Sequence, residues 1–257
     1  MPLNTLTQFA RSSASTGLNN FIDVQLSYNS NTQPGALLMV MVLARAQTTN
    51  PAMTPPVISV PTTTDGSTWL LAQSESSPLL TEAGPTYVMY TAALFYILNA
   101  AEKLASPYVD TCLITDTSVV SPNTLSANAY SYEFAAGSVG GLSSLVASAY
   151  ANGTITLPET SNLVIPSTSL VYACAVYQPN DASSLKVGSG YTAGVALYGS
   201  FTNGTDQYIL NALTGSVPTA FTFRSGQAMV VWAEVAVAFG PVAPTGFPHA
   251  FGSLIGF

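Results

Sequence analysis

Apolar and polar residues alternate with a period of two along most of the chain, and Gly, Pro and Asn separate the alternating segments. This pattern is typical of short strands joined by turns, whereas no segment carries the sustained 3.6-residue apolar stripe of a capped helix. We therefore predict an all-β chain with little helix. The predicted strands are Phe21–Tyr28, Ala36–Ala46, Val57–Val60, Trp69–Ser74, Tyr87–Asn99, Ser106–Thr115, Ser126–Phe134, Ser169–Tyr177, Tyr191–Phe201, Gln207–Ala212, Ala220–Arg224 and Met229–Phe239.

The lengths and spacing of these strands favour two packed antiparallel sheets, a jelly-roll-like β-sandwich. Turn sequences such as Gln33-Pro-Gly and Asp65-Gly lie between them. The clearest local prediction is a hairpin turn at Asn203-Gly204, because Asn-Gly readily takes the positive φ angles of a type I′ turn.

Two predicted strands are almost continuously apolar, Ala36–Ala44 and Met229–Phe239. A strand covered on one face should alternate, so each run is either a central strand covered on both faces or a strand that meets a neighbouring subunit. We expect that parts of these strands are covered within the chain and that other parts meet a neighbouring subunit. Glu234 interrupts the second run, where it could face water, pair across an interface or lie buried with a hydrogen-bond partner. The rarity of buried carboxylates favours the position that faces water.

Three regions are expected along the chain. Residues 1–18 form a Ser/Thr/Asn-rich N-terminal arm, residues 19–240 form the sandwich, and residues 241–257 form a Gly/Pro/Phe-rich docking tail. A disordered linker would be poor in aromatic residues, and this tail is not. The Gly-rich region 135–163 is interpreted as a long connection with one short strand at 152–157, and no repeat of fixed period stands out.

Composition narrows the function. The chain is 48% hydrophobic but only 7% charged, with a formal net charge of −7. The few basic residues are scattered, which argues against nucleic-acid binding and against anionic membrane surfaces. No apolar run approaches a spanning helix and no secretory signal precedes the first strand, so we expect synthesis in a cytoplasm. A surface so poor in charge must be covered by uncharged polar residues or by neighbouring molecules.

The sequence offers no specific catalytic or metal-binding pattern. Its single histidine, His249, lies in the docking tail, and Cys112 and Cys174 lack metal-ligand spacing, so both are expected to be buried thiols. Acids such as Asp110, Asp116, Glu133 and Glu234 would meet only the loosest requirement of a glycosidase, which keeps a hydrolase as a third hypothesis. We predict no enzyme activity and no cofactor.

The order of segments resembles the β-sandwich domains of tail, fibre and capsid-associated proteins of tailed bacteriophages. The resemblance is carried by Pro34-Gly-Ala-Leu-Leu-Met-Val, by Pro55-Pro56 leading to Asp65-Gly-Ser-Thr-Trp-Leu-Leu71, by Ala93-Leu-Phe-Tyr-Ile-Leu-Asn-Ala-Ala-Glu102, by Asn128-Ala-Tyr-Ser-Tyr-Glu-Phe134 and by the final apolar strand. The chain departs from that pattern in lacking an acid after the first glycine and in a longer segment between Leu71 and Tyr87. The resemblance implies a virion protein, often a trimer, that binds other virion proteins.

We therefore expect a non-enzymatic virion structural protein, capsid-associated or part of a tail, that forms a homo-oligomer. Its predicted assembly contacts are Phe247, His249, Phe251, Phe257 and Trp232. The alternative is a carbohydrate-binding module that recognises a host glycan by stacking on Tyr191, Tyr198 and Tyr208, since such sandwiches also serve in receptor-binding tips.

Overall fold

The computed structural model describes residues 5–16, 20–82, 84, 86–104, 110–116, 124–135, 144–154, 158–179, 185–194, 203–223 and 229–241. Within these ranges the chain forms 18 strands and no helix, which confirms the all-β prediction. The strands are β1 (Thr5–Thr16), β2 (Phe21–Leu26), β3 (Leu37–Thr48), β4 (Val57–Ile58), β5 (Leu70–Ser76), β6 (Leu80–Glu82), β7 (Thr86–Ile97), β8 (Asp110–Thr115), β9 (Thr124–Ala135), β10 (Ser144–Thr154), β11 (Leu163–Ile165), β12 (Ser169–Pro179), β13 (Leu185–Lys186), β14 (Thr192–Ala193), β15 (Asn203–Ala212), β16 (Gly215–Val217), β17 (Thr222–Phe223) and β18 (Met229–Gly240).

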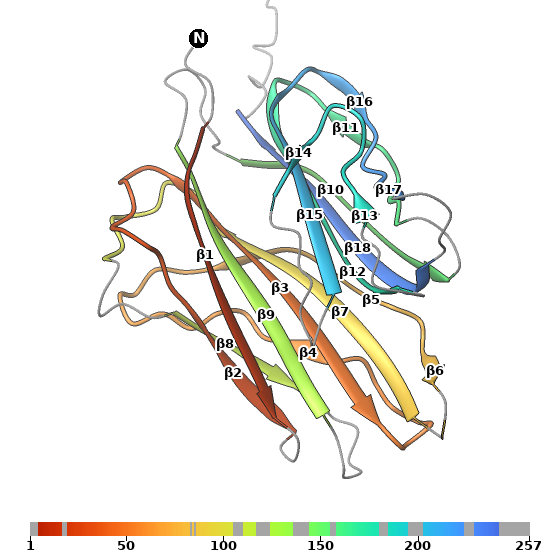
Figure 1. The fold of residues 1–257 in the computed structure, drawn as a ribbon. Coiled ribbons are helices and arrows are strands. Elements are labelled where there is room, and N and C mark those ends of the chain that lie inside the picture. The colour runs from red at the N-terminus through yellow and green to blue at the C-terminus, as the bar shows by residue number, and fades with distance from the viewer. Residues whose placement is uncertain are drawn as a thin grey trace, which may run out of the picture.

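Strands β1 to β9 build the N-terminal half of the molecule (Figure 1). Its large sheet has the order β1-β9-β3-β7-β5, with β6 also paired to β7, and its small sheet has the order β2-β8-β4. Every pairing is antiparallel. Strands β1 to β4 and β7 to β9 alternate between the two sheets as in an eight-stranded jelly roll, whereas β5 and β6 both pair with β7 in the large sheet.

Strands β10 to β18 repeat this connectivity in the C-terminal half. Their large sheet has the order β10-β18-β12-β15-β14, in which each strand takes the place of its counterpart in the first large sheet. Two short ladders, β11-β16 and β13-β17, stand where the first half has its small sheet. The single sandwich expected for residues 19–240 is thus two successive units of one topology.

The two halves also share their strand register. In the N-terminal half Phe134 pairs with Leu6 on one side and Leu37 on the other, and a bulge follows Leu6. In the C-terminal half Phe239 pairs with Leu145 and Leu170, and a bulge follows Leu145. A bulge conserved at the same place in two ladders is a designed feature of the fold rather than a local defect, so the repeat extends to single residues.

The two large sheets pack face to face and enclose the central core of the molecule. Equivalent residues interlock across it: Tyr96 meets Phe239 at 5.0 Å between ring centroids, and its counterpart Tyr208 meets Phe134 at 6.1 Å. Both contacts are edge-to-face, a favourable arrangement for aromatic pairs. The packing therefore has the reciprocal form of a two-fold dimer, although both partners belong to one chain.

Each large sheet is covered on its second face as well. The small sheet packs on the N-terminal large sheet, and the short ladders pack on the C-terminal one. As a result β3 is buried along nearly its whole length, and the residues of β18 from Val231 to Phe239 are all buried. Over their described side chains, both apolar runs are central strands covered within the chain. The expectation that part of them would meet a neighbouring subunit was therefore wrong for these residues.

Residues expected to form an N-terminal arm instead form β1, the edge strand of the N-terminal large sheet. The arm prediction was wrong because β1 is an edge strand with mostly small polar residues, and this composition is common to edge strands and linkers. Region 135–163 was interpreted as a connection, but it contains the edge strand β10. The sequence pattern did not reveal this strand for the same reason.

The hairpin turn predicted at Asn203-Gly204 does not exist, because both residues lie inside β15 and pair with Tyr177 and Val176. Gly204 is required for close packing rather than for a turn. A Cβ atom at this position would overlap the side chain of Leu43 from the facing sheet and would lie 3.2 Å from the carbonyl oxygen of Ala175.

Replacing Gly204 by Ala should therefore destabilise the protein by about 1–3 kcal/mol, the usual penalty for overpacking a core. Leu43→Val removes the overlapping Cδ atom, so the double variant should lose less stability than the sum of the two single variants. Denaturant unfolding of the four proteins in a double-mutant cycle measures this coupling. Strictly additive losses would contradict the close approach of Gly204 to Leu43.

Candidate functional site

Five of the predicted contact residues lie outside the described residues: Tyr198, Phe247, His249, Phe251 and Phe257. The sixth position, Trp232, is only 3% exposed and packs in the outer core of the C-terminal half. Gly153 lies opposite Trp232 on the neighbouring strand β10, and a Cβ atom at Gly153 would overlap the Trp232 ring. Trp232 is therefore a core residue of its own chain and not the assembly contact that was predicted.

The remaining glycan candidates, Tyr191 and Tyr208, do not form one stacking surface. Tyr191 packs against the outer core, and its hydroxyl donates a hydrogen bond of 2.8 Å to the carbonyl oxygen of Pro218. Tyr208 belongs to the central core on the other face of the same sheet. Tyr191 and Tyr208 thus lie on two different faces, and Tyr208 borders a cavity.

The two halves meet along two seams, one at each side of the central core. At the closed seam β5 packs against β10 and β18, and the Asn152 amide donates a 2.7 Å hydrogen bond to the Glu75 carboxylate. The open seam is the equivalent place on the other side, where β14 faces β1 and β9. β14 has two residues where β5 has seven, so the described strands cover less of the open seam than of the closed seam.

A cavity of about 160 Å³ lies in the open seam. Its walls are Leu6, Phe9, Tyr132, Ala193, Gly194 and Tyr208. Phe9 is 44% exposed and stacks on Tyr132 with ring centroids 6.3 Å apart. The cavity therefore combines an accessible aromatic wall on β1 with a second aromatic wall on β15.

A buried carboxylate, Asp206, lies directly behind this cavity. Its Oδ2 atom accepts hydrogen bonds from the hydroxyls of Tyr132, at 2.6 Å, and Tyr172, at 2.9 Å, so it joins the two halves. Burial, and then the negative charge of Asp206, raise the pKa of both tyrosines well above the ordinary value. Gly194 leaves the space for this carboxylate, because a Cβ atom there would overlap it.

Glu234 is fully buried, which contradicts the expectation that it faces water. It lies between Ala151 and Ala175 on the ladder-covered face of the C-terminal large sheet, where small neighbours leave room for its side chain. Neither carboxyl oxygen has a hydrogen-bond partner among the described residues. Burial raises the pKa of Glu234 well above its ordinary value, and the nearby Thr219 offsets only part of this rise.

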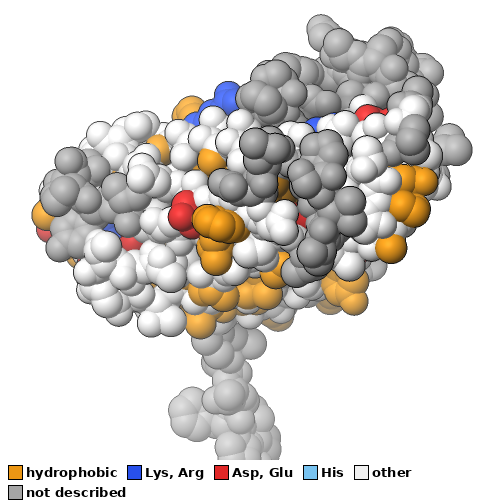
Figure 2. All heavy atoms as spheres, turned by 90° about the horizontal axis from the view of Figure 1, so that it is seen from below, with side chains coloured by type: hydrophobic (Ala, Val, Ile, Leu, Met, Phe, Trp, Pro, Cys, Tyr) orange, Lys and Arg blue, Asp and Glu red, His pale blue; other side chains and the backbone are white. Residues whose placement is uncertain are grey.

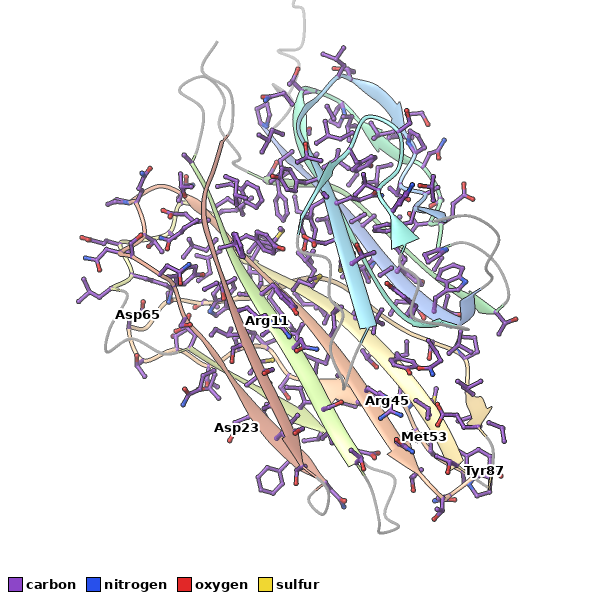
Figure 3. All side chains as sticks on the ribbon, viewed as in Figure 1. Arg11, Asp23, Arg45, Met53, Asp65 and Tyr87 are labelled. Atoms are coloured by element: carbon purple, nitrogen blue, oxygen red, sulfur yellow. The ribbon has the colours of Figure 1, made fainter. Side chains whose placement is uncertain are left out.

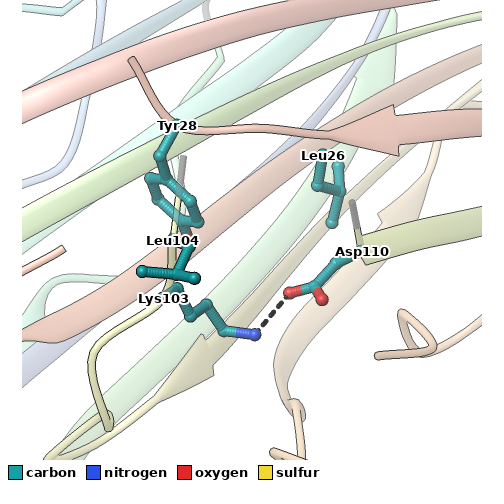
Figure 4. Close-up of a pocket in the computed structure, with 5 residues that line it drawn as sticks. All are labelled: Leu26, Tyr28, Lys103, Leu104 and Asp110. Atoms are coloured by element: carbon teal, nitrogen blue, oxygen red, sulfur yellow. Dashed lines mark hydrogen bonds and ion pairs between the residues drawn. The ribbon is translucent and has the colours of Figure 1, made fainter. Parts of the chain in front are cut away.

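A second polar cluster ties loops to the small sheet of the N-terminal half. The Lys103 ammonium lies 2.8 Å from Asp110 Oδ2 (Figure 4). It also lies 2.9 Å from Asp65 Oδ2, and the Trp69 indole donates to the same Asp110 oxygen at 2.9 Å. Burial alone would raise the pKa of Asp65, but hydrogen bonds from Ser67 and Lys103 lower it to about 2. Lys103 and Asp110 are both 3% exposed, so the pair serves to hold the structure.

The outer face of the small sheet exposes an apolar group that we call the outer patch: Phe21, Val57 and Leu113. Phe21 and Val57 lie in one row because both pair with Thr115, and Leu113 is two residues along β8. Asp23, on the same face of β2, is labelled in Figure 3. Viewed from below, most of the surface is uncharged, with scattered hydrophobic groups and few charged side chains (Figure 2).

Within the described residues no group of three or more His, Cys, Asp and Glu side chains could hold a metal ion. Cys112 and Cys174 are both buried free thiols, as predicted. Burial, and then the charge of Asp23, raise the pKa of the Cys112 thiol to about 12. Across the same part of the chain, no helix has the length and apolar character needed to span a membrane.

Comparison with known proteins identifies no relative, since the chain matches no protein-family model, no curated protein and no solved structure.

Replacing Lys103 by Met should destabilise the protein by roughly 3–5 kcal/mol, because the buried Asp110 carboxylate would lose its counter-charge. Lys186→Met is the matched control, since Lys186 is exposed on β13 and its replacement should change stability by less than about 0.5 kcal/mol. Denaturant unfolding measures both free energies. Equal effects of the two substitutions would refute the structural role of the buried pair.

Glu234 should make the protein less stable as the pH rises. The folded state keeps the proton at pH values where the unfolded chain has lost it, so stability falls above the ordinary pKa of 4.5 by up to about 1.4 kcal/mol per pH unit until the folded-state pKa is reached. Glu234→Gln should therefore be more stable than the wild type at pH 8, with a smaller difference at pH 4. Thermal unfolding across this range, with exposed Asp23→Asn as control, tests the sign.

Proposed function

We propose that this chain is a non-enzymatic virion structural protein, capsid-associated or part of a tail, that assembles with further copies of itself. The observation that carries the proposal is the outer patch, where Phe21, Val57 and Leu113 are 55%, 52% and 37% exposed. Side chains of this size gathered on one flat sheet face are typical of association surfaces.

The position of the outer patch supports contact with a second copy. It lies on a regular three-stranded sheet whose other face is anchored in the core, so the patch is held rigid before association. A rigid surface loses less conformational entropy when it binds. Interfaces between identical subunits are also more apolar than those of transient complexes, and a flat patch can meet its own copy across a two-fold axis.

The charge distribution supports the same function. The chain has 12 acidic and five basic residues, and part of this small number is already used inside the fold by Lys103, Asp110, Asp206 and Glu234. Little charge remains on the surface to oppose association of like molecules. A virion also keeps its components at high local concentration, where modest contacts suffice for assembly.

The triple variant Phe21→Ser, Val57→Thr, Leu113→Thr should lower the molecular mass in solution from that of an oligomer to that of a single chain. Sedimentation equilibrium measures the mass, and circular dichroism checks that the all-β fold persists. Val164→Thr with Leu213→Ser is the matched control, since these residues are 72% and 78% exposed but lie outside the patch. A monomeric wild type, or a triple variant that still oligomerises, would refute assembly through this face.

The virion assignment has its own test. Mass spectrometry of purified particles should detect the chain as a stoichiometric component, and particles carrying the triple variant should contain less of it. A chain absent from particles but abundant in the infected cell would exclude the structural assignment.

A further inference from the structure

We propose that the open-seam cavity is a binding site for one neutral sugar ring. The inference concerns a different surface from the outer patch and does not depend on assembly. The cavity has a volume of about 160 Å³, which suits a single six-membered ring, and two of its wall residues, Leu6 and Phe9, belong to β1.

The walls suit the two faces of a pyranose. The C–H face of such a ring is apolar and packs on aromatic rings, which Phe9 and Tyr208 supply from opposite strands. The rim of the sugar carries hydroxyls, and the polar groups at the wall are the Tyr208 phenol and the peptide groups at Gly194. Pockets that combine apolar walls with a few placed polar groups are the usual form of small-molecule sites.

The charges around the cavity favour a neutral ligand. None of the six wall residues is charged, and the Asp206 carboxylate behind Gly194 would repel an anion. A cation would gain little from Asp206, which is 1% exposed and already accepts two tyrosine hydroxyls. Arg11, two residues along β1 from Phe9, is held over the ring of Tyr130 at 5.9 Å.

The hydrogen bonds of Asp206 hold two walls of the cavity in place. It fixes Tyr132 by a hydrogen bond, and Tyr132 in turn stacks against Phe9. Gly194 is bonded to the same residue through its backbone, since its N–H donates to the Asp206 carbonyl oxygen at 3.1 Å. Walls that are held before the ligand arrives reduce the entropy lost on binding.

The closed seam provides an internal comparison. The equivalent position there is filled by contacts of β5 with β10 and β18, so the same fold can be closed with seven residues in its fifth strand. Its exposed aromatic residue, Tyr150, is 58% exposed but lines no comparable cavity among the described residues. Tyr150 is therefore the matched control for Phe9.

The test is titration of the full chain, by saturation-transfer NMR and calorimetry, with methyl glycosides of glucose, galactose, mannose and N-acetylglucosamine. Choline and sialic acid serve as the cationic and anionic probes. We expect at least one neutral glycoside to bind with a dissociation constant near the millimolar range, typical of a single small ring in a shallow site. Binding of none of the neutral glycosides, or of a charged probe alone, would overturn the proposal.

Three variants locate the binding. Phe9→Ala removes the accessible wall and should weaken binding at least tenfold, and Ala193→Phe should abolish it by filling the cavity from an exposed position. Tyr150→Ala should leave the affinity unchanged. Unchanged binding in both cavity variants would place the sugar elsewhere and refute the site, and the thermal midpoint of each variant verifies that it is folded.

Discussion

The structure depends on one packing interaction, the face-to-face contact of the two large sheets. Each sheet alone would expose an apolar face, because the inward residues of β3, β7 and β9 are as hydrophobic as those of β12 and β18. Burying such faces is the dominant favourable contribution to folding. The contact also brings Tyr132 of one half to Asp206 of the other, so the few polar groups in the core bind across it. Neither half is complete without its partner, although each has the full connectivity of a jelly roll.

The strands that pack on this core were the ones that could be predicted from sequence. Apolar runs and period-two alternation located β2, β3, β7, β9, β12 and β18 to within a few residues, because burial on one or both faces dictates those patterns. Edge strands such as β1 and β10 were missed because many of their side chains are exposed, and exposed positions accept the small polar residues that are also common in linkers. The outermost short strands carry even less pattern and were found only in part.

The repeat and the candidate site could not be predicted because they depend on pairs of residues far apart in sequence. Equivalent positions are identical at Leu6 and Leu145 or at Tyr96 and Tyr208, yet Leu94 corresponds to Asp206, and the intervening loops differ in length. A search for a fixed period has nothing to detect in such a chain. Gly204 illustrates the same limit. The dipeptide Asn203-Gly204 is typical of a turn, but glycine is needed here because Leu43 of the facing sheet occupies the space that a Cβ atom would take.

The differences between the two halves are as informative as their likeness. A two-fold arrangement of identical units would have two identical seams, and any opening would occur twice. Here β5 is long enough to close one seam, whereas β14 ends after two residues and leaves Phe9 exposed across from Tyr208. Core positions such as Leu94 and Asp206 can differ only where neighbouring side chains compensate, because every change there is felt by both sheets. Divergence is tolerated at the edges, where a shortened strand loses few contacts. The edge of the sheet is thus where a structural scaffold of this kind can acquire a binding site without loss of its core.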